Sequence, residues 1–178
     1  MQLALDTETV ASPEEARQNI LLQRAKRYAR MEEQDADEEL VKLLYFEHGP
    51  SVYGIPLDDL REVRVLRGFC SIPGARRTVP GIFYYRGEIL SLHDLTAFMG
   101  TKTDEAARWV IIVEHDGQRM GVMARDVLDV REVAMSRVRP APVTLGDRAG
   151  CLQGIIEDQT LLLRTDALFT NPSFSVGM

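Results

Sequence analysis

The chain has little of the chemistry that most enzymes use. Its 178 residues include two cysteines and three histidines, and the histidines lie in three different predicted elements. It has no Gly-x-Ser-x-Gly, His-Glu-x-x-His or P-loop motif, so hydrolase and nucleotidase activities lack their usual residues. Cys70 and Cys151 lie far apart and do not form a metal-spacing pair. We therefore expect no catalytic residues, no metal and no cofactor.

Long hydrophobic runs and an excess of basic residues are absent too. No apolar run approaches the roughly 20 residues that span a bilayer, and the first residues have neither the basic nor the apolar region of a signal peptide. The net charge of −6 argues against nucleic acid or an anionic membrane surface as a partner. We expect a cytoplasmic protein without direct membrane insertion, in which both cysteines are buried and reduced.

The negative charge is concentrated at the N-terminal end. Residues 1–40 carry ten acidic and five basic side chains, which accounts for −5 of the net charge of −6. Ser12–Glu15 is typical of a helix start, with a capping residue, a proline at the first position and a glutamate at the third. One narrow apolar stripe follows at helical spacing, formed by Leu21, Leu22, Ala25, Tyr28 and Ala29. We expect a helix and an acidic linker over 1–40, with the stripe packed either on the rest of the chain or on a partner helix.

From Val41 onward the hydrophobic spacing becomes that of β-strands. Short β-prone runs alternate with turn signals such as Asp116-Gly117. The expected strands cover 41–46, 52–55, 61–66, 82–85, 89–92, 109–114, 118–123, 126–133, 151–157 and 160–163. Short helical pieces are expected at 56–60, 94–100 and 165–169. The absence of crossover helices excludes a parallel α/β fold, and the pattern predicts a mainly β barrel or sandwich.

The most informative turn is Arg86-Gly87, which lies between two apolar runs at 82–85 and 89–92. Gly87 can take a positive φ, so the sequence predicts a tight hairpin. Such a turn lifts the Arg86 guanidinium out of an apolar surface, where it can bind carboxylate or carbonyl groups of a protein partner. The same dipeptide is also typical of an ordinary solvated hairpin.

The order of motifs over 41–170 resembles the CheW family, the scaffold proteins of bacterial chemosensory arrays. The matching pieces are Tyr53-Gly54-Ile55, Glu62-Val63, Ile72-Pro73, Gly81, Arg86-Gly87, Gly121-Val122, Val127–Val130, Arg139–Pro142 and Gly154. The resemblance implies a mainly β fold of two intertwined five-stranded SH3-like barrels that share a core, with an N-terminal helical extension. It divides the chain into the segment 1–40, a CheW-like domain over 41–170 and a C-terminal tail over 171–178.

The resemblance also implies a function and a set of contact residues. The function is that of a non-catalytic adaptor that couples chemoreceptors to a CheA-type histidine kinase. The partners are the kinase regulatory domain and the cytoplasmic tip of a methyl-accepting chemoreceptor, at membrane-associated arrays. Carried over by position, receptor or array contacts fall on Arg86, Gly87, Glu62 and Leu60. Weaker kinase contacts fall on Val110 and Val127.

Three departures from the family pattern leave alternatives open. Tyr84-Tyr85 stands where the family has Asn-Leu, Ser91-Leu92 where it has Pro-Val, and Ala124–Asp126 where it has Val-Asp. These changes favour a divergent partner, or a pathway that controls an output other than swimming. A barrel-type ligand or nucleic-acid binder is a further alternative, because five arginines gather in one stretch: Arg125, Arg131, Arg137, Arg139 and Arg148. His93-Asp94 resembles a catalytic pair, but adjacent strand residues point to opposite faces, so we expect a structural histidine.

Overall fold

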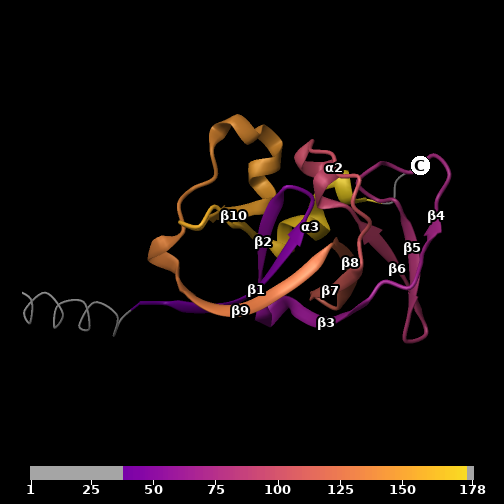
Figure 1. The fold of residues 1–178 in the computed structure, drawn as a ribbon, viewed down its shortest axis with the longest axis horizontal. Coiled ribbons are helices and arrows are strands. Elements are labelled where there is room, and N and C mark those ends of the chain that lie inside the picture. Colours follow the sequence, from indigo (N-terminus) through magenta and orange to yellow (C-terminus); the bar gives the residue numbers. More distant parts are fainter. Residues whose placement is uncertain (1–37, 176–178) are drawn as a thin grey trace, which may run out of the picture. The chain divides into compact units, whose positions relative to one another are not determined.

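The structure is a computed structural model that describes residues 38–175 (Figure 1). The predicted N-terminal helix and nearly all of the acidic linker lie outside the described residues. The strands are β1 (Leu40–His48), β2 (Ser51–Pro56), β3 (Leu60–Val65), β4 (Cys70–Ser71), β5 (Gly81–Tyr85), β6 (Glu88–His93), β7 (Trp109–His115), β8 (Gln118–Ala124), β9 (Asp126–Ala134), β10 (Leu152–Ile155) and β11 (Leu161–Leu163). The α-helices are α2 (Leu95–Met99) and α3 (Thr165–Thr170), and the 3-10 turns are η1 (Leu57–Asp59), η2 (Met135–Arg137), η3 (Val143–Cys151) and η4 (Pro172–Phe174).

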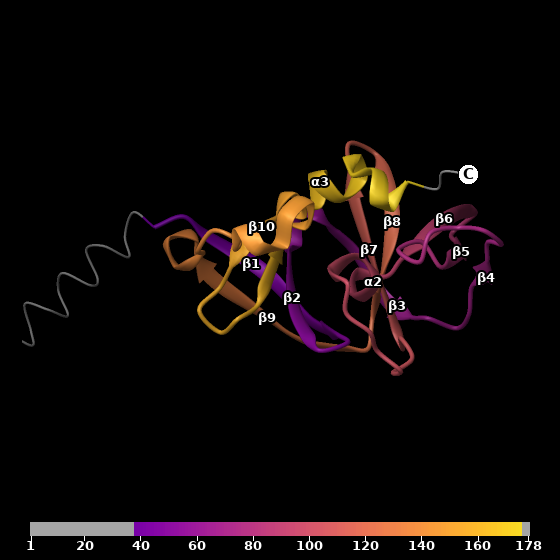
Figure 2. The same cartoon turned by 90° about the horizontal axis from the view of Figure 1, so that it is seen from above.

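The strands form two sheets that exchange segments of the chain. The first sheet has the order β10-β11-β2-β1-β9, and the second has the order β3-β7-β8-β6-β5-β4. The chain starts the first sheet with β1 and β2, builds the whole second sheet, and returns with β9 to β11 (Figures 1 and 2). This confirms the predicted mainly β fold of two intertwined barrels. The second sheet has a sixth strand, the two-residue β4 at its edge.

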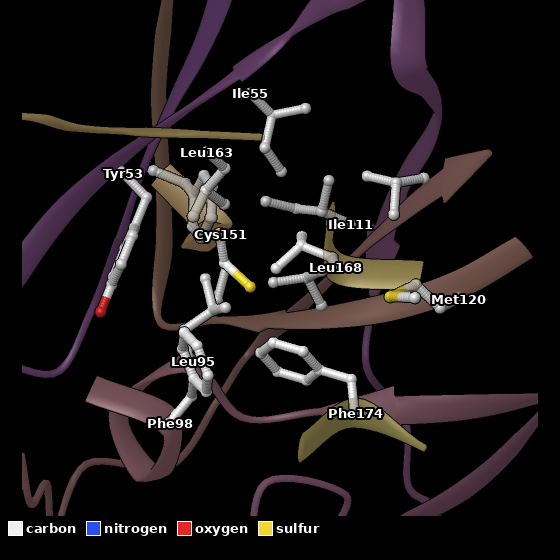
Figure 3. Packing of buried hydrophobic residues seen from close by; sticks show 14 of the residues in the cluster. Tyr53, Ile55, Leu95, Phe98, Ile111, Met120, Cys151, Leu163, Leu168 and Phe174 are labelled. Carbon is white, nitrogen blue, oxygen red and sulfur yellow. The ribbon is translucent and has the colours of Figure 1, made fainter. Parts of the chain in front are cut away.

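One hydrophobic core joins the two sheets. Phe46, Tyr53 and Ile55 enter it from the first sheet, and Ile111 and Met120 enter it from the second. Helices α2 and α3 close the core with further apolar side chains, among which Figure 3 shows Leu95, Phe98 and Leu168. Since neither sheet has this core to itself, the two barrels form one folding unit.

A polar contact next to this core fixes β1 against the start of α2. His48, the last residue of β1, is 1% exposed, and its Nε2 lies 3.1 Å from Oδ1 of Asp94. The same carboxylate caps α2 by accepting hydrogen bonds from the backbone N–H groups of Thr96 and Ala97. Burial alone would raise the pKa of Asp94, but the hydrogen bonds from His48 and Thr96 outweigh it and lower the pKa.

Residues 171–175 differ from the predicted tail over 171–178, whose last three residues lie outside the described residues. Phe174 is 5% exposed and belongs to the shared core, where its ring centroid lies 4.6 Å from that of Phe98 (Figure 3). Arg76 donates a hydrogen bond of 2.7 Å to the carbonyl of Pro172. The domain therefore extends through η4.

The two cysteines lie in different environments, and the expectation of burial is wrong for one of them. Cys151 is buried in the core, and burial raises the pKa of its thiol. Cys70 is exposed, because β4 is an edge strand that pairs only with β5. Both thiols are free. Over residues 38–175, no helix is long and apolar enough to cross a membrane.

Candidate protein-binding site

The Arg86 turn is a two-residue hairpin at the end of β5 and β6. Tyr85 pairs with Glu88 across the turn, and Arg86 and Gly87 have φ values of 47° and 96°. Two successive positive φ values are typical of the type I′ turn, whose twist matches that of the strands. A Cβ at Gly87 would meet nothing within 4 Å, so its left-handed backbone, not a lack of space, favours glycine there.

The hairpin stands on its own small apolar cluster. Phe83, Tyr85 and Leu90 are at most 8% exposed and pack on Val110 and Ile112 of β7. The turn therefore projects from a packed base, which positions the backbone of Arg86.

At the tip, Arg86 pairs with a predicted contact residue from another strand. Its Nη2 lies 2.8 Å from Oε2 of Glu62 on β3, and that oxygen also accepts a hydrogen bond of 3.0 Å from the Tyr85 hydroxyl. The guanidinium lies over the Tyr85 ring, 5.5 Å from its centroid. Burial, followed by the hydrogen bond to Glu62 and its charge, raises the pKa of Tyr85, so this hydroxyl stays protonated as a donor.

Next to this group, further side chains of alternating charge form ion pairs with one another. Arg119 on β8 pairs with Glu88 at 3.0 Å and also with Glu114 of β7, which Arg61 contacts at 3.1 Å. The hydrogen bond from Arg119 lowers the pKa of Glu114, so its carboxylate stays ionised. Together with Arg86, Glu62 and Tyr85, most of these side chains line a shallow pocket of about 280 Å³.

In this arrangement, a charged group of a protein partner can replace one member of the ion pair between Arg86 and Glu62. The side chain of Arg86 is 71% exposed and that of Glu62 is 28% exposed. An ion pair between such groups contributes about 0–1 kcal/mol. A partner can therefore replace either member at little cost, while the pair keeps the guanidinium oriented in the free protein.

Comparison with known proteins identifies the family. The profile of the CheW-like domain matches residues 42–172. The chain belongs to the CheW family. A chemotaxis protein CheW of Helicobacter pylori is 25% identical over 137 residues, covering 76% of this chain and 83% of that protein. A chemotaxis protein CheW of Klebsiella aerogenes is 31% identical over 132 residues, covering 68% of this chain and 76% of that protein.

A solved structure agrees with the fold. The crystal structure of the scaffolding protein TtCheW from Thermoanaerobacter tengcongensis has a TM-score of 0.66 and 26% sequence identity to this chain. The match covers 76% of this chain and 91% of the other. The two proteins thus share the CheW fold.

The structure brings together only part of the contact set predicted from the CheW resemblance. Arg86, Gly87 and Glu62 meet at the hairpin tip. Leu60, although it is on β3 with Glu62, packs against the shared core. Val110 is 1% exposed beneath the hairpin, so direct contact between its side chain and a partner is ruled out in this conformation. Val127 lies in the other sheet, on β9, and is partly buried against the shared core.

The resemblance missed an exposed apolar pair beside the turn. Tyr84 and Ile89 face each other across β5 and β6 and are 71% and 69% exposed. Strand alternation was the signal that could have found them. Because Phe83 and Tyr85 face inward, Tyr84 must face outward. Its hairpin partner Ile89 lies on the same face of the sheet.

His93 and Asp94 do not act as a pair. The Nε2 of His93 lies 2.7 Å from the hydroxyl oxygen of Ser91, whereas Asp94 contacts His48. Burial lowers the pKa of His93 to about 4, so the imidazole is neutral near pH 7. This geometry agrees with the expected structural role of His93.

The arginines between 125 and 148 do not form one basic surface. Arg125 pairs with Glu47 and Glu105, and Arg131 pairs with Asp129 and Asp158. Arg139 lies 4.0 Å from Glu157, and Arg148 donates to the carbonyl of Met99. Carboxylates balance most of this charge, which disfavours a strand of nucleic acid as the ligand.

Proposed function

We propose that this protein is a non-catalytic adaptor that couples chemoreceptors to a CheA-type histidine kinase in a bacterial chemosensory array. The observation that carries the proposal is membership of the CheW family over 42–172, together with a preformed hairpin that presents Arg86. The names of the relatives support a chemotaxis role, and the solved neighbour is named a scaffolding protein. The proposed partners are the regulatory domain of the kinase and the cytoplasmic tip of a receptor. The proposed location is the cytoplasm, at membrane-associated arrays.

The proposed receptor or array contact is the tip formed by Arg86, Gly87 and Glu62. Arg86 offers a guanidinium that is oriented by Glu62 yet remains mostly exposed. Leu60 supports this contact from the core side of β3. For the kinase, Val127 is the proposed contact, and Val110 supports the hairpin from below.

One feature favours a partner that differs from that of a standard family member. Tyr84 replaces the family's asparagine and, with Ile89, adds an exposed apolar surface next to Arg86. An aromatic side chain on a rigid strand is a strong anchor for a protein interface. We infer that the cognate receptor or kinase has an apolar patch opposite this position. A chemosensory pathway with an output other than swimming is compatible with such a change.

The test is a pull-down of the purified protein against the regulatory domain of each CheA-type kinase and the tips of the receptors from its own genome. We expect one kinase domain to bind in the micromolar range, equivalent to about −8 kcal/mol. Arg86→Glu should weaken array or receptor association, and Arg137→Glu, an exposed arginine on η2, is the control with the same charge change. Failure of folded protein to bind any kinase domain would contradict the adaptor role.

A charge swap separates partner contact from support of the hairpin. The double variant Arg86→Glu with Glu62→Arg keeps an ion pair at the tip but reverses its direction. If Arg86 contacts the partner, the swap should bind as poorly as the single variant. Recovery of binding in the swap would mean that Arg86 acts only by holding the hairpin.

A further inference from the structure

A second pocket shares no residue with the hairpin pocket. Its volume is about 540 Å³, and it lies between the loop at 72–80, helix α2 and the segment 100–104. This size falls in the range of sites for small ligands or a few side chains, about 300–1,000 Å³. Its apolar surface comes from Ile72, Ala75, Pro80 and Ala97, which are partly exposed. The pocket can therefore take up an apolar side chain.

Three basic side chains line the same pocket, and no carboxylate pairs with them among residues 38–175. Arg76 donates to the carbonyl of Pro172, a neutral group. Arg77 and Lys102 are exposed and make no hydrogen bond or ion pair within the described part of the chain. The hairpin pocket is different, because each of its arginines has a glutamate partner.

The acidic side chains around this pocket leave a net positive charge. Asp94 is committed to His48 and to the cap of α2. Asp104 also lines the pocket, is exposed, and offsets one of the three cations. Positive charge beside an apolar surface matches a ligand that carries both carboxylates and an apolar group.

The wall of the pocket is held in place before any ligand arrives. In the loop, the N–H of Val79 donates to the carbonyl of Arg76 at 2.9 Å. The backbone N–H of Asp94 donates to the carbonyl of Thr78 at 2.9 Å. The Arg76 bond to Pro172 ties the same loop to the C-terminal segment. A preformed site loses less conformational entropy when it binds.

We propose that this pocket is a binding site for a short acidic peptide segment of a partner protein. An apolar side chain of the peptide packs on Pro80 and Ala97, and flanking carboxylates pair with Arg77 and Lys102. The apolar surface favours a peptide over a phosphate group, and the net charge of −6 opposes long polyanions. This site is independent of the Arg86 hairpin and of the proposed adaptor role.

The test is a titration of a fluorescein-labelled peptide, with one leucine between paired glutamates, against the full-length protein. We expect saturable binding that weakens as NaCl rises from about 50 to about 300 mM. The double variant Arg77→Glu with Lys102→Glu should weaken binding by about tenfold or more. Asp104→Asn should strengthen it, and a peptide with serine in place of leucine should bind more weakly.

The control is Arg67→Glu with Arg137→Glu, which changes the net charge equally through exposed arginines outside the pocket. Circular dichroism melting confirms that each variant is folded. Amide chemical shifts should change over 72–80 and 94–104 when the peptide binds. No saturable binding, equal loss in the control variant, or full competition by inorganic phosphate would overturn the peptide site.

Discussion

Replacing His93 by glutamine is expected to change how the free energy of unfolding depends on pH. The imidazole is 1% exposed and its ring packs edge-on at 5.4 Å from that of Phe174. Its Nδ1 has no hydrogen-bond partner among residues 38–175. Burial lowers its pKa from 6.5 to about 4. Between these values the unfolded chain binds a proton here and the folded chain does not, so stability falls as pH decreases. Over this interval the loss is about 3 kcal/mol.

This loss of stability can be measured by urea unfolding of the parent and of His93→Gln, followed by circular dichroism between about pH 7 and pH 4.5. The variant should show a smaller loss of stability on acidification, whatever its stability at pH 7. His115→Gln, which removes a partly exposed imidazole, is the matched control for the chemical change. Asp94 acts in a different window, because its lowered pKa adds stability that is lost only as pH falls below 3.8. Equal pH dependence in the parent and His93→Gln would refute the reasoning.

Other substitutions test the packing and the hairpin by urea unfolding at pH 7. Arg86→Ala should change the free energy of unfolding by less than about 1 kcal/mol, because its ion pair is exposed. Asp94→Ala should cost about 2 kcal/mol, since it removes the cap of α2 and leaves His48 without its partner. Phe174→Ala should cost about 3 kcal/mol by opening a cavity in the shared core. Gly121→Ala should cost about 1–3 kcal/mol, because the new Cβ would lie 2.5 Å from a buried ring.

Each of these expectations has an opposing result. If Arg86→Ala unfolds the protein, Arg86 has a structural role. An unchanged stability of the Phe174 variant would mean that the C-terminal segment contributes nothing to the core. If the free energy of unfolding of Asp94→Ala equals that of the parent, water replaces the carboxylate in its contacts with His48 and the start of α2. A stable Gly121 variant would require the ring of Phe83 to move, which crystallography of the variant would reveal.

The element order was predictable because the turns carry strong local signals. Asp116-Gly117 and Arg86-Gly87 mark their hairpins by residue type alone, and Asp94 with Gly100 marks both ends of α2. Alternation of apolar residues gave the strands between them. All of these are properties of residues close together in sequence. The family resemblance supplied the arrangement of the strands into two barrels.

The contacts between distant segments were not predictable in the same way. The contact between His48 and Asp94 spans 46 residues, and the pair formed by Glu62 and Arg86 joins β3 to the turn between β5 and β6, which do not pair with β3. In neither pair does the sequence around one residue indicate which distant residue it contacts. The prediction that Cys70 is buried was wrong for a related reason, because its exposure depends on β4 having only one neighbouring strand. Local pattern fixes which face a strand residue occupies, and long-range pairing decides what covers that face.

The exchange of strands between the sheets has a consequence for synthesis on the ribosome. Among the strands, the hairpin of β1 and β2 leaves the ribosome first, yet the two strands that flank it, β9 and β11, come from the second half of the chain. The β1 edge therefore stays open until residue 134 has been made, and the β2 edge until residue 163. The contacts that close these edges have long sequence separation, which slows folding. All strands of the second sheet have been made by residue 124, before β9, β10 and β11, so they can pair with one another before the β1–β2 hairpin is enclosed.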